Sequence, residues 1–125
     1  VSSGDEIMSL RHVVRAVPVP EHVETEAIRL VMATQPGSPH ASELVNEYVM
    51  LGSSPRGAQA LLLAGKVRAI LDGRFAVSGD DVRGVAPAAL RHRLLVNFHG
   101  QSDGITPDRV VTDVLAHVQP EFGNA

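Results

Sequence analysis

Arg56 is the residue whose type and position point most directly to a chemical role. It follows Ser54 and Pro55, and these three open a largely apolar run that extends to Leu71. Ser54 is placed to cap a helix and Pro55 suits the first helical position, so Arg56 is expected in the first turn. Because the N-terminus of a helix attracts anions, a guanidinium there favours a phosphate or carboxylate site. An exposed arginine or a local salt bridge is the alternative that the spacing leaves open.

Two patterns that would support catalysis by this chain are incomplete. A nucleophile elbow, G-x-S-x-G, would begin at Gly52 and needs glycine where Arg56 stands. A phosphate-binding loop, G-x-x-x-x-G-K-[ST], fails at Gly65-Lys66, because Val67 follows them inside a predicted helix. We therefore expect no enzymatic activity from this chain on its own.

Histidines and paired carboxylates give no metal-binding pattern. No two histidines are spaced i, i+4, the arrangement that places two zinc ligands on one helix face. The pairs Asp5-Glu6 and Asp80-Asp81 stand at predicted helix starts, where the helix dipole favours negative charge. No metal site is predicted from these residues or from His12, His22, His40, His92, His99 and His117.

Arg91, His92 and Arg93 form a short basic segment, to which Lys66 and Arg68 would add if the fold brings them close. The whole chain has a formal net charge of −3 and only 3% aromatic residues. Both values disfavour binding to nucleic acid, including a role as a small helical DNA-binding domain. Contact with another domain or protein, and simple exposure to solvent, both stay open for this segment.

The composition is that of a folded domain. The 125 residues are 44% hydrophobic and 20% charged, which predicts one globular domain rather than a disordered chain. The chain has no cysteine, so disulfides and thiolate sites are excluded. It contains no apolar run near 18 residues and no pattern of a secretion signal, so we expect no membrane contact and a cytoplasmic location. Because aromatic residues are scarce, the core is expected to consist of Leu, Val, Ile and Ala.

Apolar residues recur at helical intervals over most of the sequence. Ser3 and Ser78 each begin a capping pattern, with a carboxylate three residues later. Prolines and the pair Asp72-Gly73 are expected to end or separate helices. The predicted helices cover residues 3–17, 20–34, 54–71, 78–86, 87–98 and 106–118.

The helix over residues 54–71 is expected to be central, because it is apolar on two faces. Residues 44–51 fit either one more helical turn or a brief strand, and residues 74–77 are expected as a very short extended segment. The predicted fold class is all-α, a compact bundle of about five to seven helices. The apolar faces of the central helix are Ala60, Leu63, Ala64, Val67, Ile70 and Leu71 on one side, and Ala58, Leu61 and Leu62 on the other.

Several segments together resemble one family, the MoxR-type AAA+ ATPases, in the C-terminal lid domain. The similarity runs from about residue 13 to residue 118, and its order and spacing make it specific. The matching segments are residues 48–57, with Gly52-Ser53-Ser54-Pro55-Arg56-Gly57 at the helix start, then residues 64–75, 81–83, 86–87, 90–94, 97–100 and 104–106.

The resemblance implies an AAA+ helical lid over residues 1–118 with a flexible tail over residues 119–125. It implies that Arg56 is the sensor-2 arginine, flanked by Ser54 and Pro55, and that it reaches the γ-phosphate of ATP bound with Mg²⁺ on a nucleotide-binding core missing from this chain. Family members are expected to form homo-oligomeric rings, as hexamers, and to remodel or mature partner proteins in a chaperone-like way. A von Willebrand factor A-domain protein is an implied partner.

Two positions depart from the family pattern. Leu51 stands where an aromatic residue is usual, and Gly57 replaces an alanine after the arginine. Neither change removes Arg56, and the glycine is expected to lower helix propensity only slightly. The alternative function is a helical protein-interaction module with no nucleotide role, which would dock a partner through residues 91–93 or 106–118.

Overall fold

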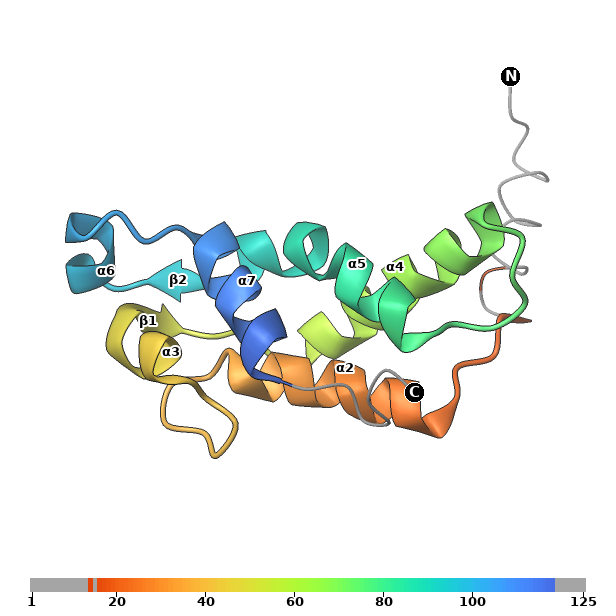
Figure 1. Ribbon diagram of the computed structural model, residues 1–125, viewed down its shortest axis with the longest axis horizontal. Coiled ribbons are helices and arrows are strands. Elements are labelled where there is room, and N and C mark those ends of the chain that lie inside the picture. The colour runs from red at the N-terminus through yellow and green to blue at the C-terminus, as the bar shows by residue number, and fades with distance from the viewer. Residues whose placement is uncertain (1–13, 15, 119–125) are drawn as a thin grey trace, which may run out of the picture.

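The computed structural model describes residue 14 and residues 16–118, and these form a helical bundle with a small sheet at one end (Figure 1). The fold class predicted from the sequence is therefore confirmed. The predicted helix over residues 3–17 and the tail over 119–125 lie largely or wholly outside the described residues. The elements are α2 (Glu21–Ala33), α3 (Glu43–Tyr48), β1 (Val49–Leu51), α4 (Arg56–Leu71), α5 (Gly79–Leu90), a 3₁₀ turn (Arg91–Arg93), β2 (Leu95–Val96), α6 (Phe98–Ser102) and α7 (Pro107–His117).

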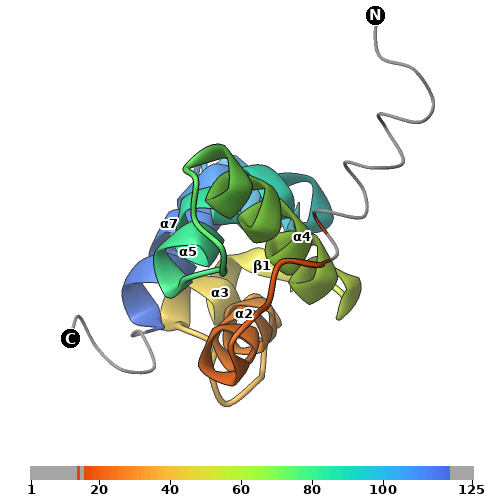
Figure 2. The same cartoon turned by 90° about the vertical axis from the view of Figure 1, so that its right-hand side faces the viewer.

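The core lies where α4 and α5 pack on each other and on α2 and α7 (Figure 2). It is aliphatic, as the composition predicts: Leu30, Leu61 and Leu90 are fully buried. Phe75 and Phe98, by contrast, are 89% and 83% exposed. Among the described residues, no helix has the length and apolarity needed to cross a lipid bilayer.

Local signals place several helix ends where the sequence predicts them. Ser78 and Asp81 form a complete capping box at the start of α5, and the side chain of Thr106 accepts a hydrogen bond from the Arg109 backbone N–H at the start of α7. At the end of α4, Gly73 has φ 73°, and the N–H groups of Gly73 and Arg74 donate to the carbonyls of Ile70 and Ala69. This is a Schellman ending, which satisfies carbonyls that the helix leaves open.

The predicted helix over residues 87–98 is wrong. Pro87 does not open a new helix but lies inside α5, which continues to Leu90. Although proline removes one helical hydrogen bond, Ala86 and Leu90 are both fully buried, and this packing holds the last turn in place. Beyond Leu90 the chain makes a 3₁₀ turn, then β2 and α6.

The only strands among residues 16–118 are β1 and β2, which pair antiparallel with Val49 opposite Val96 and Leu51 opposite Leu95. The ambiguous stretch 44–51 thus contains both candidates, a helix followed by a strand. The extended segment expected at residues 74–77 is not a strand. Its last residue, Val77, is buried, and the Val77 N–H donates to the Pro18 carbonyl at 3.2 Å, which ties the loop to the chain before α2.

α4 is central, but one of its two predicted apolar faces lies outside the core. Gly57, Ala58, Leu61, Gly65 and Ala69 form its buried stripe. In the face expected to be buried with Ala60 and Ala64, Leu63, Val67 and Leu71 are 56%, 40% and 80% exposed. The described elements therefore leave these three apolar side chains largely uncovered, whereas Ile70 of the same predicted face is half-buried against the core.

Asp81 is a buried carboxylate that the sequence analysis assigned only to a helix start. It receives hydrogen bonds from both terminal guanidinium nitrogens of Arg74, each at 2.5 Å, and from the Ser78 backbone N–H at 2.8 Å. Burial is the largest influence on its pKa and raises it, but the hydrogen bonds from Arg74 and Ser78 together outweigh burial and lower the pKa below its usual value.

Asp81 is expected to make folding sensitive to acid. Because its pKa is lower in the folded than in the unfolded chain, the ionised form stabilises the fold above the unfolded pKa of about 3.9, and this contribution is lost as the pH falls through the folded value. Urea unfolding at pH values from 7 down to 3 should show that Asp81→Asn is less stable than wild type at pH 7 and that the difference shrinks below about pH 4. A difference independent of pH would contradict this account.

Candidate functional site

The loop that leads into α4 is anchored on the end of α2. The Ser53 backbone N–H donates to the Thr34 hydroxyl at 2.9 Å, and the Gln35 side-chain amide donates to the Ser53 carbonyl. Thr34 in turn donates to the Val31 carbonyl at 2.6 Å. Thr34 and Ser53 are both fully buried, so the loop has one well-defined path.

Gly52 makes this close approach possible. A Cβ atom at position 52 would lie 2.3 Å from the Thr34 carbonyl oxygen and 2.8 Å from the Gln35 backbone nitrogen. Both contacts are with backbone atoms, so a side chain at this position requires the loop or α2 to move.

Gly52→Ala is therefore expected to lower the free energy of unfolding by about 1–3 kcal/mol. Urea denaturation of the 125-residue chain measures the change. The matched control is Ser54→Ala in the same loop, because Ser54 is exposed and its hydroxyl makes no hydrogen bond within the described residues. If the two variants lose the same small amount, the loop is not held against α2.

α4 begins one residue later than predicted. Pro55 precedes the helix instead of occupying its first position, and Ser54 supplies no side-chain cap. Instead the Ser54 carbonyl accepts from the Gly57 N–H at 2.8 Å, and the Pro55 carbonyl accepts from the Ala58 N–H at 3.0 Å. Two donors of the first turn are thus already used, so the attraction for an anion here depends mainly on Arg56 and the helix dipole.

Arg56 is the first residue of α4 and is exposed. Within the part of the chain that the structure describes, its guanidinium makes no hydrogen bond or ion pair. Arg74 and Arg83 differ, since each is bonded to a buried carboxylate, and Arg68 donates to the Asp80 carbonyl. The local salt bridge left open by the sequence is therefore absent among these residues, and Arg56 is available to an external anion.

Gly57 has a packing role that its helix propensity does not reveal. A Cβ atom there would lie 2.0 Å from the Ser53 hydroxyl oxygen and 3.3 Å from a Leu90 methyl group. Glycine at position 57, where the family resemblance predicts alanine, thus leaves room for the buried Ser53 side chain. It also lets the start of α4 lie close to the end of α5.

An apolar hollow opens on the α2 side of the same loop. Its volume is about 480 Å³, and its apolar lining comes mainly from Ile28, Val31 and Met32 of α2 and from Ala58 and Leu62 of α4. Ser53 and Pro55 border it, so it reaches the loop that precedes Arg56. Glu24, Gln35 and Gln59 add polar groups to this lining, and Arg56 lies beside the hollow as the residue after Pro55.

Two of the segments that carry the family resemblance meet beside β1. The Asn97 backbone N–H donates to the Tyr48 carbonyl at 2.8 Å, and the Tyr48 ring lies against His99, with centroids 5.1 Å apart. The Tyr48 hydroxyl donates to Asp103 at 2.8 Å, and this bond raises the pKa of Tyr48 to about 12. These residues attach α6 to α3, which is a structural role that the sequence analysis missed.

The basic segment does not gather the cations that the sequence suggested. Arg91, His92 and Arg93 are all exposed in the 3₁₀ turn after α5, and Arg91 pairs with Asp108 at 3.2 Å. Arg68 instead bonds to Asp80 at the opposite end of α5, so it does not extend the segment. Among residue 14 and residues 16–118, no three His, Asp or Glu side chains gather as metal binding requires.

A protein-family model described as "AAA lid domain" matches residues 41–114. This range includes the anchored loop, all of α4 and α5, and the α3–α6 contact. It is more than half of the chain, and it contains each residue that the sequence analysis assigned to the site.

The chain is also similar to named proteins. It is 30% identical over 118 residues to "Chaperone MoxR1" of Mycobacterium tuberculosis, covering 94% of this chain and 31% of that protein. It is 29% identical to "Protein MoxR" of Methylorubrum extorquens, covering 86% of this chain and 32% of that protein. A crystal structure from Cytophaga hutchinsonii, of a protein assigned as an ATPase, superposes with a TM-score of 0.86 at 27% identity, over 92% of this chain and 35% of that one. The chain thus spans about a third of the length of these relatives.

Proposed function

Because this chain belongs to the AAA lid domain family and is the lid of a MoxR-type AAA+ ATPase, we propose that Arg56 is its sensor-2 arginine. In this role the guanidinium contacts the γ-phosphate of ATP bound on the protein's own nucleotide-binding core. The observation that carries the proposal is an exposed arginine without a partner among the described residues, at the start of α4 and directly after a loop held by buried hydrogen bonds.

The donor set at this position suits a phosphate. Arg56 carries a planar, permanently charged group with several N–H donors, and the dipole of α4 adds positive potential at the same end. ATP with Mg²⁺ supplies the phosphoryl group that is transferred to water. Ser54 and Pro55 position Arg56, and the hollow beside them supports contact with the apolar part of the nucleotide. The lid provides one face of the site, so it does not hydrolyse ATP alone.

An arginine that contacts the γ-phosphate also couples the position of the lid to hydrolysis. The contact exists with ATP and is lost when the phosphate leaves, so the two nucleotide states favour different lid positions. In the whole protein this motion drives chaperone-like remodelling or maturation of partner proteins, in a homo-oligomeric ring expected as a hexamer. We place the lid at residues 1–118, the whole protein in the cytoplasm, and a von Willebrand factor A-domain protein among its partners.

The direct test measures ATP hydrolysis by the full-length protein, by its Arg56→Ala variant and by this chain alone. The first is expected to turn over, the second to lose nearly all turnover, and the third to be inactive. Equal turnover in the first two would overturn the sensor role.

A further inference from the structure

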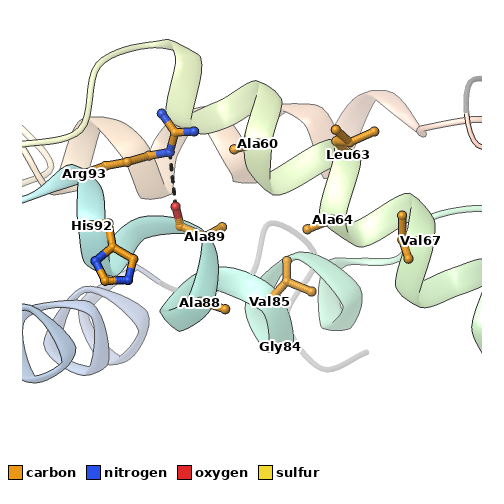
Figure 3. Close-up of a pocket in the computed structure, with 10 residues that line it drawn as sticks. All are labelled: Ala60, Leu63, Ala64, Val67, Gly84, Val85, Ala88, Ala89, His92 and Arg93. Atoms are coloured by element: carbon orange, nitrogen blue, oxygen red, sulfur yellow. Dashed lines mark hydrogen bonds between the residues drawn. The ribbon is translucent and has the colours of Figure 1, made fainter. Parts of the chain in front are cut away.

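The two sides of α4 join the rest of the bundle in different ways. Towards α5 the helix borders a groove lined by apolar and small side chains, among them Leu63, Ala64 and Val85 (Figure 3). These side chains carry no hydrogen-bonding group, and apolar packing has no preferred direction. Towards α2 the loop before α4 is held by hydrogen bonds with Thr34 and Gln35, which are directional. The α2 side thus supplies directional contacts just before the start of α4.

Thr34 and Gln35 together hold both backbone polar groups of Ser53. The Ser53 N–H donates to the Thr34 hydroxyl at 2.9 Å, and the Ser53 carbonyl accepts from the Gln35 side-chain amide. The Thr34 hydroxyl donates its one proton to the Val31 carbonyl at 2.6 Å, which leaves its lone pairs for the Ser53 N–H. Because both groups are held, the peptide planes on either side of Ser53 cannot rotate without breaking one of these bonds.

The path from Ser53 to Arg56 is short and stiff. Arg56 follows Ser53 by three residues, and one of the two residues between them is Pro55, whose ring restricts its φ angle. The Gly57 N–H closes the first turn on the Ser54 carbonyl at 2.8 Å. A displacement of Ser53 is therefore passed on to the backbone of Arg56.

We propose that Thr34 and Gln35, at the end of α2, are positioning residues for Arg56. The inference rests on the proposed function, because it takes the γ-phosphate contact of Arg56 as the property that they serve. Both side chains act through the backbone of Ser53 and not on the phosphate. A misplacement of about 1 Å can cost about 10²-fold in rate, so the loss of either bond should be visible in turnover.

Gln35 has a second neighbour, which gives it an alternative role. Its side chain also lines the apolar hollow between α2 and α4, where a bound nucleotide would contact it directly. The two roles differ in their kinetics. Positioning of Arg56 acts on the transition state and lowers kcat with KM little changed, whereas the loss of a contact with bound nucleotide raises KM.

Steady-state ATP hydrolysis by the full-length protein tests the proposal. Gln35→Met keeps the length of the side chain but removes the amide, and Thr34→Val keeps the shape but removes the hydroxyl. Each should lower kcat by about tenfold or more, with KM within about twofold of wild type. Thr34→Ser restores the hydroxyl and should recover most of the turnover. A raised KM at normal kcat in Gln35→Met would assign Gln35 to nucleotide contact and overturn its positioning role.

The matched control is Thr112→Val, the same substitution on α7. The Thr112 hydroxyl donates to the Asp108 carbonyl at 3.0 Å within that helix, so the variant also loses a hydrogen bond to a backbone carbonyl. It should leave kcat and KM unchanged. If Thr34→Val does not fold, Gln35→Met decides the outcome by itself, because it leaves the bond between Thr34 and Ser53 in place.

A double-mutant cycle separates positioning from general damage. If Gln35 acts through Arg56, Gln35→Met should have little further effect on kcat once Arg56 is replaced by alanine. Additive losses would show that Gln35 acts elsewhere, which would overturn the proposal and leave the sensor role intact. Normal turnover in Arg56→Ala alone would instead overturn the sensor role, and the positioning role with it.

Discussion

Arg56→Ala is expected to reduce the turnover number for ATP hydrolysis by about 10²–10³-fold in the full-length protein, which is the usual cost of removing one preorganised donor from a site where charge develops. The fold should be unaffected, because the Arg56 side chain is exposed and its guanidinium makes no hydrogen bond or ion pair within the described residues. Steady-state kinetics give the effect, and thermal unfolding of the same variant checks that the structure is intact.

The chain offers a matched control for this experiment. Arg109 is also an exposed arginine in the first turn of a helix, α7, and its side chain makes no hydrogen bond or ion pair within residues 16–118. Arg109→Ala should leave turnover unchanged. Arg56→Lys should retain part of the activity, because lysine keeps the charge but lacks the planar fork of donors. If Arg109→Ala and Arg56→Ala lose equal activity, the effect comes from net charge and not from a phosphate contact.

Arg83→Ala is expected to lower the free energy of unfolding by about 3–5 kcal/mol, which is the cost of leaving a buried charge without its partner. Arg83 lies on α5 and its Nε donates to Glu26 of α2 at 2.6 Å, where the Glu26 side chain is 3% exposed. The same guanidinium donates to the carbonyls of Leu115 and Val118 at the end of α7. One side chain thus connects three helices.

Urea denaturation at pH 7 measures this loss, with Arg91→Ala as the control. Arg91 pairs with Asp108 at the surface, where both side chains are about half exposed, so its removal should cost about 0–1 kcal/mol. The double variant Glu26→Leu/Arg83→Met should recover much of the stability, because it removes both buried charges together. A loss at Arg83 no larger than that at Arg91 would show that the buried pair does not hold the helices together.

Helix starts and ends were predictable wherever a few neighbouring residues determine them. The Ser78–Asp81 capping box, the Thr106 cap and the left-handed Gly73 depend on hydrogen bonds within one or two turns, so their sequence patterns are sufficient. The start of α4 was predicted only to within one residue, because Ser54 supplies no side-chain cap and Pro55 precedes the helix. The aliphatic core was predictable, because a chain with so few aromatic residues has no other material for it.

Features that depend on distant partners were not predictable in this way. Residues 95–96 became a strand because β1, more than forty positions earlier, offers free backbone groups. α5 continues through Pro87 because Ala86 and Leu90 are buried by other helices, and this packing offsets the lost hydrogen bond. At such positions the free energy gained by burying side chains exceeds the local preference for helix or strand. The sequence pattern alone therefore favours the wrong structure.

The sequence by itself determined the all-helical fold and the place of Arg56 at a helix start, and contact of Arg56 with an anion stays a prediction. Only the tertiary structure decided that the Arg56 side chain has no hydrogen bond or ion pair among the described residues, that Thr34 and Gln35 hold the loop before it, and that Leu63 lies on the outer face of α4. The physical reason is that an apolar helix face looks the same in sequence whether another helix covers it or not. Whether a side chain is buried, and whether a charged group has a partner, depends on segments that are distant in the sequence. Those segments come together only when the chain has folded.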